Sequence, residues 1–179
     1  MALKNGEQPT GVESSCQNTQ SSFVNDANPK RSTSPQDSPA VSTCLETEGE
    51  FAGWKCFKDN GFDSLTGPFW YRREVNGGMR CAFRVEQKHL NIAGYTHGGC
   101  YMAFADFCLF MIAKPVKPGP GVTTNMACEF IDSAREGDVI VGTGQVTRAG
   151  RSLIFVRGQL AEQERLLFTF SGTIKRSRQ

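Results

Sequence analysis

Several features that define other classes of protein are missing from this 179-residue chain. It has no uninterrupted apolar run of the roughly 18 residues that span a bilayer, so we expect no membrane span. Residues 1–20 lack the basic start and the hydrophobic stretch of a secretory signal. The seven cysteines are an odd number without a Cys-x-x-Cys pair, which argues against a zinc ribbon, a disulfide framework and a dithiol redox site. The sequence therefore predicts a cytoplasmic protein.

The first 50 residues contain few large apolar side chains and differ in charge from the rest of the chain. They carry three basic and seven acidic residues, whereas residues 51–179 carry 17 basic and 11 acidic ones. Such a polar segment buries too little apolar surface to offset the entropy lost on ordering. We expect a disordered low-complexity tail over 1–50, either passive or phosphorylatable, and one compact domain over 51–179. The acidic residues disfavour a mitochondrial targeting sequence.

The domain combines one apolar helix with six strand-like segments. Asp106 is the only charged residue of 100–113, so this helix is expected to be buried on all sides. The apolar spacing over 51–60 predicts one face of a short helix. Asn76-Gly77 is typical of a hairpin turn. The expected strands cover 69–75, 80–86, 122–131, 138–148, 152–160 and 165–175, and the turns between the last four are short enough for antiparallel neighbours. The pattern predicts an α+β fold in which an antiparallel sheet wraps around the helix.

Asp106 is the strongest functional signal in the sequence. Desolvating a carboxylate in an apolar helix is costly, so it is expected to be protonated or held by specific partners. One interpretation places it at a solvent boundary or makes it cap a neighbouring element. The other makes it a general base or nucleophile in a dry pocket.

The start of the helix supplies a complementary group. Thr96-His97-Gly98-Gly99 opens the helix, where unpaired backbone N–H groups favour developing negative charge. Glycine there admits a substrate carbonyl to an oxyanion hole, but it also permits plain close packing. Gly98 and Asp106 lie about 12 Å apart along the helix axis, too far for one reacting carbon to reach both. A two-fold dimer with antiparallel helices would bring the Gly98 end of one chain to Asp106 of the other.

The order of these residues resembles that of the hotdog-fold acyl-CoA thioesterases, most closely the PaaI type. The resemblance covers most of 51–179 and rests on Asn91-x-x-Gly94-x-x-His97-Gly98-Gly99 followed by Asp106. Further matches are Gly121-Val122-Thr123, Phe130, Gly137-Asp138, Arg148-x-Gly150-Arg151 and Gly172-Thr173. The family implies a six-stranded antiparallel sheet around a central helix. It also implies dimers joined through continuous sheets, tetramers built from two dimers, and active sites shared between subunits.

The chemistry that this resemblance implies is hydrolysis of an acyl-CoA thioester to the free acid and CoA. No metal and no cofactor are expected, because coenzyme A is part of the substrate. Asp106 would activate water or attack the thioester, and the Gly98 N–H, helped by His97, would polarise the carbonyl. Asn91 would orient the thioester or the water, and Thr123 lies where relatives bind the attacking water. The remaining expected substrate-binding residues are Gly99, Arg148, Gly150 and Arg151.

These residues also have structural interpretations. His97 could cap the helix, Asn91 could be a turn residue, and Thr123 could be an ordinary β-former. A group of basic residues fits either solvated strand ends or the phosphates of coenzyme A, and no nucleic-acid recognition motif accompanies it. This group is Arg148, Arg151, Arg157, Lys175, Arg176 and Arg178.

Two other functions compete with hydrolysis. A non-catalytic acyl-CoA sensor has no use for a buried base, so Asp106 counts against it. Hotdog dehydratases and hydratases use a histidine with an acidic partner, in arrangements such as Asp-x-x-x-x-His or a His-Phe-Pro-Gly segment. Neither is present, and the residues five before the two histidines are Arg84 and Ile92. Phe104, Phe107 and Phe110 indicate an apolar pocket around Asp106, and they fit an aryl or a fatty acyl group alike.

Overall fold

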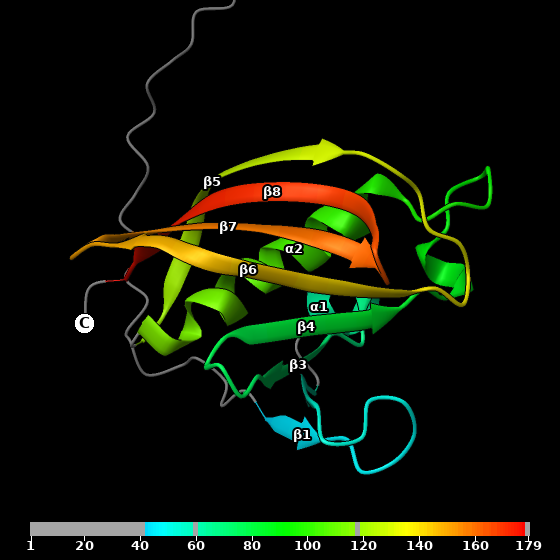
Figure 1. The fold of residues 1–179 in the computed structure, drawn as a ribbon, viewed down its shortest axis with the longest axis horizontal. Helices are drawn as coiled ribbons and strands as arrows, with labels where there is room; N and C mark the ends of the chain where they lie inside the picture. The colour runs from blue at the N-terminus through cyan, green and yellow to red at the C-terminus, as the bar shows by residue number, and fades with distance from the viewer. Residues whose placement is uncertain (1–41, 59–60, 117–118, 178–179) are drawn as a thin grey trace, which may run out of the picture. The chain divides into compact units, whose positions relative to one another are not determined.

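A computed structural model describes residues 42–58, 61–116 and 119–177 of the chain. Within them, an antiparallel sheet of eight strands lies around one long helix, in the order β1-β2-β3-β4-β6-β7-β8-β5 (Figure 1). The strands are β1 (Thr43–Leu45), β2 (Lys55–Phe57), β3 (Trp70–Arg73), β4 (Met79–Arg84), β5 (Gly121–Phe130), β6 (Val139–Ala149), β7 (Leu153–Glu162) and β8 (Arg165–Arg176). The helices are α1 (Phe62–Thr66) and α2 (Gly98–Ala113), with 3₁₀ turns at Gln87–His89 and Lys114–Val116.

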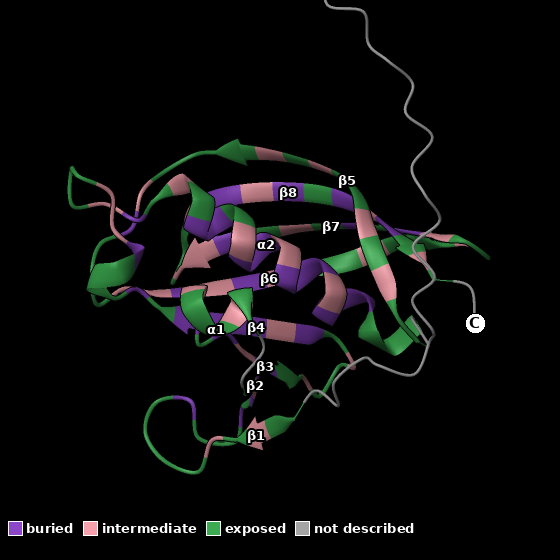
Figure 2. Ribbon diagram, turned by 180° about the vertical axis from the view of Figure 1, so that it is seen from behind, coloured by how far each residue is buried: buried purple, intermediate pink, exposed green. Residues whose placement is uncertain are grey.

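Helix α2 is apolar because the sheet covers most of its surface. Five of its side chains have no exposed area: Phe104, Ala105, Cys108, Leu109 and Ala113. One side of the helix stays open, where no sheet strand covers it along most of its length (Figure 2). We call this side the open stripe; its half-buried or exposed residues recur every fourth position, at Met102, Asp106, Phe110 and Lys114. The expectation of burial on all sides is therefore wrong for this stripe.

Residues Gly98–Val116 form a helical segment of 19 residues that is long and apolar enough to cross a membrane. The sequence count of uninterrupted apolar residues did not reach this length, because Asp106 and Lys114 divide the segment. The fold itself buries 56% of the apolar window. A core helix passes the same test of length and composition, so the segment is weak evidence for a span.

Six of the strands match the expected ones to within two residues at either end. The β3–β4 hairpin turns where Asn76-Gly77 predicts it, with Gly77 at a φ of 84°. The expected hairpin between β5 and β6 is wrong, because β5 pairs with β8 and β6 pairs with β4. The connection over 131–138 crosses about three strand spacings, roughly 14 Å, which eight extended residues span with ease.

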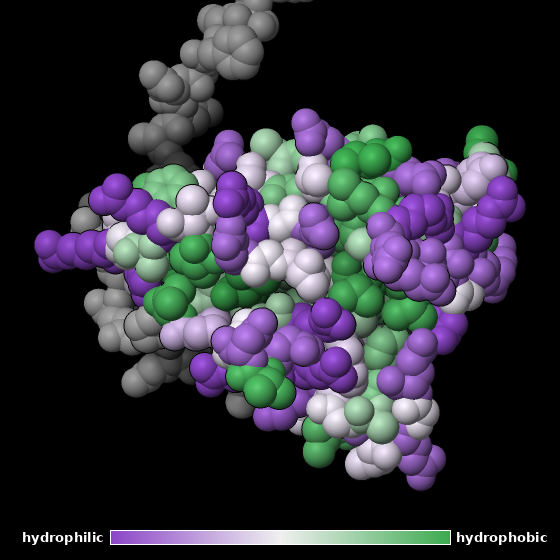
Figure 3. All heavy atoms as spheres, in the orientation of Figure 1, coloured by the Kyte–Doolittle hydropathy of each residue, from purple (hydrophilic) through white to green (hydrophobic). Residues whose placement is uncertain are grey.

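The domain begins earlier than residue 51. Strand β1 pairs with β2 and places Thr43 opposite Phe57, so the interpretation of all of 1–50 as a disordered tail is wrong at its end. The helix expected over 51–60 is also wrong, because Lys55–Phe57 forms strand β2. Phe51 stacks on Trp70 of β3 with ring centroids 4.0 Å apart. That aromatic contact lies on the sheet face away from α2. Figure 3 shows that the outer face of the sheet mixes hydrophobic and hydrophilic side chains. Residues 1–41 lie outside the described part of the chain.

A disulfide links Cys44 to Cys56, which corrects the argument against disulfides. The two residues are directly opposite each other on β1 and β2, with Cα atoms 5.4 Å apart. Their separation of 12 residues gave no signal, because strand pairing rather than sequence spacing brings them together. The free cysteines of the described residues are Cys81, Cys100, Cys108 and Cys128.

Candidate active site

Asp106 is held by a residue of the neighbouring strand. The Thr123 hydroxyl of β5 donates a hydrogen bond of 2.6 Å to Asp106 Oδ1. Both residues are half-buried, and Asp106 lies on the open stripe of α2. Thr123 pairs with Ile174 immediately before a bulge in β5. The hydroxyl orients one carboxylate oxygen, and the other oxygen is available to a proton donor such as water. We call Asp106 and Thr123 the carboxylate half-site.

His97 caps the first turn of α2. Its Nδ1 accepts a hydrogen bond of 2.9 Å from the Gly99 N–H. The accepting Nδ1 places the proton of a neutral imidazole on Nε2, which can donate outward. The His97 backbone N–H donates to the His89 carbonyl at 2.7 Å, so the cap is fixed to the preceding turn. The capping interpretation of His97 is therefore confirmed.

Gly98 supplies the first backbone N–H of α2. Among the described residues this N–H has no hydrogen-bond acceptor, as expected for a helix start. A β-carbon on Gly98 would lie 3.0 Å from the Phe130 ring, so close packing also favours glycine here. The packing interpretation is confirmed, because Gly98 lies against Phe130 of β5. The oxyanion hole stays a prediction, for which the free N–H is available.

Asn91 forms a turn beside this donor. Its Oδ1 accepts hydrogen bonds from the Ala93 N–H at 2.9 Å and the Tyr95 N–H at 3.2 Å. The turn interpretation is therefore confirmed for the side-chain oxygen, and the side-chain NH₂ remains able to donate. Asn91 and Gly98 line one pocket of about 420 Å³. We call Asn91, His97 and Gly98 the amide half-site.

Two buried residues support the amide half-site, and the sequence did not indicate either. His89 is 3% exposed, and its Nδ1 accepts from the Glu86 N–H at 2.8 Å. Burial, followed by the charge of Lys88, lowers the pKa of His89. Tyr101 Oη accepts from the Ala134 N–H at 2.8 Å, and burial raises the pKa of this phenol. The signal available for His89 was that the chain has two histidines and that this one lies eight residues before His97.

The cysteines of α2 do not compete with Asp106 as nucleophiles. Burial raises the pKa of Cys100 to about 12. The pKa of Cys108 is also raised, first by burial and then by its hydrogen bond with Cys81. A thiol is nucleophilic as the thiolate, so both groups are inactive at neutral pH.

The two half-sites are separated within one chain. Gly98 lies against Phe130 at the end of β5, whereas Asp106 contacts Thr123 near the start of that strand. Along α2 the separation of Gly98 and Asp106 is about 12 Å. One chain therefore does not place the free N–H and the carboxylate on the same reacting carbon.

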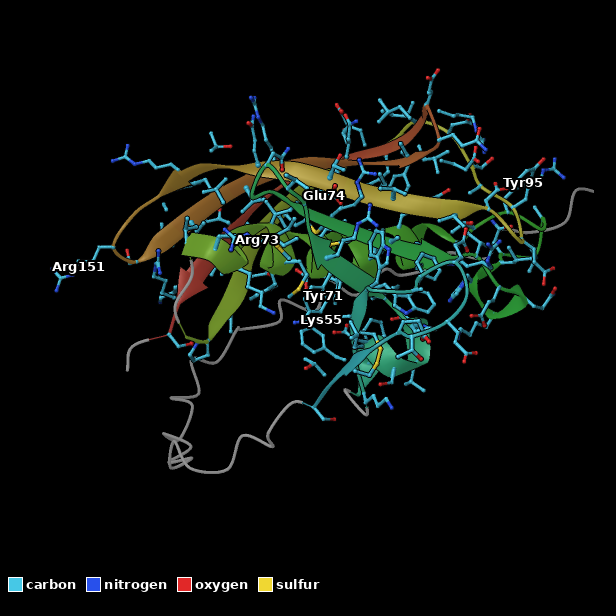
Figure 4. The ribbon with its side chains drawn as sticks, turned by 60° about the horizontal axis from the view of Figure 1, so that its bottom comes forward. Lys55, Tyr71, Arg73, Glu74, Tyr95 and Arg151 are labelled. Atoms are coloured by element: carbon cyan, nitrogen blue, oxygen red, sulfur yellow. A yellow bond between two sulfur atoms is a disulfide. The ribbon has the colours of Figure 1, made fainter. Side chains whose placement is uncertain are left out.

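The structure places the other expected residues apart from both half-sites, except Gly99, which belongs to the helix cap. Arg148 and Arg151 are exposed at the turn between β6 and β7, and Figure 4 shows Arg151 at an extremity of the molecule. The Gly150 N–H donates to the Leu153 carbonyl at 2.7 Å and closes this turn. Arg178 lies outside the described residues. Among the residues that the structure describes, no three His, Cys, Asp or Glu side chains are grouped to hold a metal ion.

Comparison with known families defines the class of this protein. The family model of the thioesterase superfamily matches residues 93–169. A Pseudomonas aeruginosa protein named as an esterase is 31% identical over 118 residues, which cover 65% of this chain and 88% of that protein. The chain belongs to the thioesterase superfamily. Human acyl-coenzyme A thioesterase 13 is 28% identical over 107 residues, or 59% of this chain and 76% of the relative.

Solved structures confirm the fold. The Escherichia coli PaaI protein from the phenylacetic acid degradation operon superposes with a TM-score of 0.59 at 19% identity, covering 68% of this chain and 86% of that one. A thioesterase protein of Streptococcus pneumoniae, solved with coenzyme A, gives a TM-score of 0.55 at 20% identity, covering 61% and 88%. The hotdog fold is therefore confirmed, and the expected six strands are corrected to eight in the described residues.

Proposed function

We propose that this chain hydrolyses acyl-CoA thioesters to the free acid and CoA. Membership of the thioesterase superfamily supports this reaction, as do a relative named acyl-coenzyme A thioesterase and a structural neighbour solved with coenzyme A. The observation that carries the proposal is the hydrogen bond between Thr123 and Asp106. It holds a carboxylate in a fixed orientation on the open stripe of an otherwise apolar helix.

In the proposed reaction Asp106 acts as a general base. Its carboxylate takes a proton from water, and the resulting hydroxide adds to the thioester carbonyl carbon. The negative charge on the carbonyl oxygen is stabilised by the Gly98 N–H at the positive end of α2. The C–S bond then breaks, and the proton on Asp106 passes to the departing CoA sulfur. In the alternative route the carboxylate itself attacks the carbonyl carbon, the C–S bond breaks and the CoA thiolate leaves, which forms an anhydride between Asp106 and the acyl group. Water then opens the anhydride to the free acid and the Asp106 carboxylate, and the released proton passes to the CoA sulfur.

The other residues position the reactants in this proposal. Thr123 orients Asp106, and the Asn91 NH₂ donates to the thioester or to the water. His97 holds the helix start and presents Nε2–H beside the Gly98 N–H. Arg148, Gly150 and Arg151 meet the phosphates of CoA at the β6–β7 turn, where guanidinium groups suit phosphate oxygens. The reaction needs no metal and no cofactor.

We further propose that two copies of the chain complete each site, as a homodimer or a dimer of such dimers. Strand β5 is at an edge of the sheet and pairs on one side with β8. Its exposed apolar side chains include Val122 and Phe130, at 56% and 57% exposure. Antiparallel pairing of β5 with its symmetry copy continues the sheet and brings the partner subunit's Gly98 toward Asp106.

Release of free thiol from a panel of aryl and fatty acyl-CoA substrates tests the reaction. The wild-type chain is expected to release thiol, and Asp106→Asn is expected to lower kcat by about 10² to 10⁴ because the amide cannot accept the proton. Glu164→Gln, at an exposed acid of the β7–β8 turn, is the matched control. Near-wild-type turnover by Asp106→Asn would overturn the assignment.

Single-turnover reaction in H₂¹⁸O separates the two routes. Label in the product acid alone supports the activated water, whereas label in the Asp106 carboxylate supports direct attack. Binding of acyl-CoA without release of thiol would favour the non-catalytic sensor, and turnover of an enoyl-CoA would favour a hydratase.

We also propose that the chain functions in the cytoplasm without nucleic acid. The buried free thiols of Cys81, Cys100 and Cys108 suit a reducing compartment, whereas the Cys44–Cys56 bond would be reduced there. Cell fractionation with thiol counting of the purified chain tests this location.

A further inference from the structure

A second pocket lies at the carboxyl end of α2 and has a volume of about 510 Å³. Lys55 of β2, Tyr71 and Arg73 of β3, and Lys114 at the end of the helix all line it. Lys55 is directly opposite Tyr71, and Arg73 is opposite the buried Met79. Side chains alternate between the two faces of a strand, so Lys55, Tyr71 and Arg73 share the face that packs on α2. Figure 4 shows Lys55, Tyr71 and Arg73 near one another.

The Tyr71 hydroxyl joins the helix to this group. Lys114 Nζ donates a hydrogen bond of 3.1 Å to Tyr71 Oη and lies 4.4 Å from the centroid of the Tyr71 ring. Tyr71 is 4% exposed and its ring packs near Phe107, with centroids 6.2 Å apart. The pocket is therefore built on a buried aromatic side chain with its polar atom directed to the cations.

Four cations line the pocket, and three of them, Lys55, Arg73 and Lys114, have no counter-charge among the described residues. No carboxylate lies within ion-pairing distance of Lys55, Arg73 or Lys114, whereas Arg72 and Arg80 share Glu74. Uncompensated positive charges repel one another, and a bound anion relieves that repulsion. The pocket is consequently suited to an anionic group that accepts hydrogen bonds.

One residue of the pocket lining, Lys114, lies on the same open stripe as Asp106. Lys114 follows Asp106 by two steps of four residues, with Phe110 between them, which is about 12 Å along the axis. An extended chain of about eight to ten carbon–carbon bonds covers that distance. In the proposed antiparallel dimer the partner helix begins beside Asp106, so the stretch from Phe110 to Lys114 extends beyond its tip.

We infer that this pocket binds the terminal carboxylate of a medium-length acyl group whose thioester lies at Asp106. This inference rests on the proposed hydrolysis and names its substrate class: the CoA thioesters of dicarboxylic acids. The apolar surface of Phe110 suits the methylene chain, and Lys55, Arg73 and Lys114 suit the carboxylate. A phosphate of CoA is the other source of an anion, but the arginines of the β6–β7 turn are the group proposed for that end of the substrate.

A pair of substrates of equal length tests the inference. Decanoyl-CoA and its dicarboxylic analogue, decanedioyl-CoA, differ in the terminal carboxylate alone. The wild-type chain is expected to show a kcat/KM ratio that favours decanedioyl-CoA by about tenfold or more, the effect of one charge-assisted hydrogen bond. Lys55→Gln and Arg73→Gln are each expected to lower that ratio by about tenfold. Lys58→Gln, three residues from Lys55 and outside the pocket lining, is the control and should leave the ratio unchanged.

The possible outcomes separate the inference from the function on which it rests. If Lys55→Gln and Arg73→Gln slow both substrates equally, the cations hold a CoA phosphate and the inference is overturned. A ratio near one in the wild-type chain, with decanoyl-CoA still hydrolysed, overturns the inference and leaves the thioesterase function intact. Hydrolysis of neither substrate contradicts the proposed function itself.

Binding of free decanedioate, measured by calorimetry, gives a readout that does not depend on turnover. We expect the wild-type protein to bind decanedioate and Lys55→Gln to bind it about tenfold more weakly. Binding of decanoate, which has a single carboxylate, measures how much the hydrocarbon part of the ligand contributes. Absence of decanedioate binding to the wild-type chain would contradict the inference.

Discussion

At the scale of single residues, the carboxylate half-site depends on a hydroxyl supplied from another element. Thr123 is a β-branched residue that suits its strand, and the same side chain donates to Asp106. A hydrogen bond to a charged group contributes more than one between neutral groups. Thr123 therefore serves both as a strand-forming residue and as the residue that orients Asp106. From the sequence alone, these two roles are alternatives.

Thr123→Val tests this role because valine keeps the branched shape and removes the hydroxyl. We expect kcat for acyl-CoA hydrolysis to fall about 10- to 100-fold, since Asp106 loses its orienting donor. The neighbouring Thr124→Val is the matched control, as the Thr124 hydroxyl donates to the Thr173 carbonyl and not to Asp106. Equal loss of activity in the two variants would contradict an orienting role for Thr123.

His89 predicts how the free energy of unfolding depends on pH. Its pKa is lowered in the folded chain by burial, so the unfolded chain binds the proton more readily. Stability is therefore fully present above the ordinary histidine pKa of about 6.5 and is lost as pH falls toward the lowered value. Urea unfolding between pH 7.5 and 5.5 should show this loss, and His89→Asn should reduce it. An unchanged slope in the variant would assign the pH dependence to other groups.

At the scale of elements, the beginning of α2 combines stability with the proposed chemistry. His97 caps the helix through Nδ1, and Gly98 supplies the free N–H one residue later. Loss of a helix cap costs about 1 kcal/mol. The observed cap uses Nδ1 of His97, whereas the proposed catalytic contribution would use Nε2, so the two are separable by substitution.

His97→Ala and His97→Asn make this separation. We expect alanine to lower the free energy of unfolding by about 1 kcal/mol, whereas asparagine restores most of it because its side-chain oxygen can accept from the helix N–H. If Nε2–H helps to polarise the carbonyl, kcat stays low in both variants. Full recovery of kcat by His97→Asn would show that the residue acts through the cap alone. Chemical denaturation and thiol release measure the two quantities.

The sequence predicted the elements that carry strong periodic or local signals. The apolar segment gave α2, and alternating residues with short turns gave β3 to β8 to within two residues. Strands β1 and β2 have three residues each, too few for a pattern, and their pairing depends on contacts such as Phe51 on Trp70. The sequence also did not predict which strand pairs with β5, because the curvature of the sheet decides that β5 lies beside β8.

For the candidate site, the sequence indicated which residues to consider but not which contacts they make. The group Asn91, His97, Gly98 and Asp106 follows from local motif order, and the separation of the two half-sites follows from helix geometry. The supporting role of His89 depends on a backbone contact across a turn. The pocket of Lys55, Arg73 and Lys114 brings together three elements that are far apart in sequence, so no local pattern could indicate it.

At the scale of the whole molecule, the separated half-sites predict complementation between two inactive variants. Asp106→Asn removes the base, whereas Asn91→Asp removes the donating NH₂ and keeps the oxygen that holds the turn. In a dimer with shared sites, one chain of each kind forms one intact site. Random pairing of equal amounts should restore about a quarter of wild-type activity.

Thiol release after co-refolding the two variants measures this recovery. Each variant refolded alone is the control and should remain inactive. Absence of recovery in a mixture shown to contain mixed dimers would mean that each site is complete within one chain.

The short strand β1 at one border of the sheet has a consequence for how the proposed dimers grow. A sheet can add strands at both of its borders, and a molecule that did so would polymerise into a filament. Here one border is the ten-residue β5, while the opposite one is the three-residue β1. A border strand of three residues offers few backbone N–H and C=O groups with which an added strand could pair. In the proposed dimer we therefore expect lateral addition at the β5 border alone, so that association through the sheet ends at two chains.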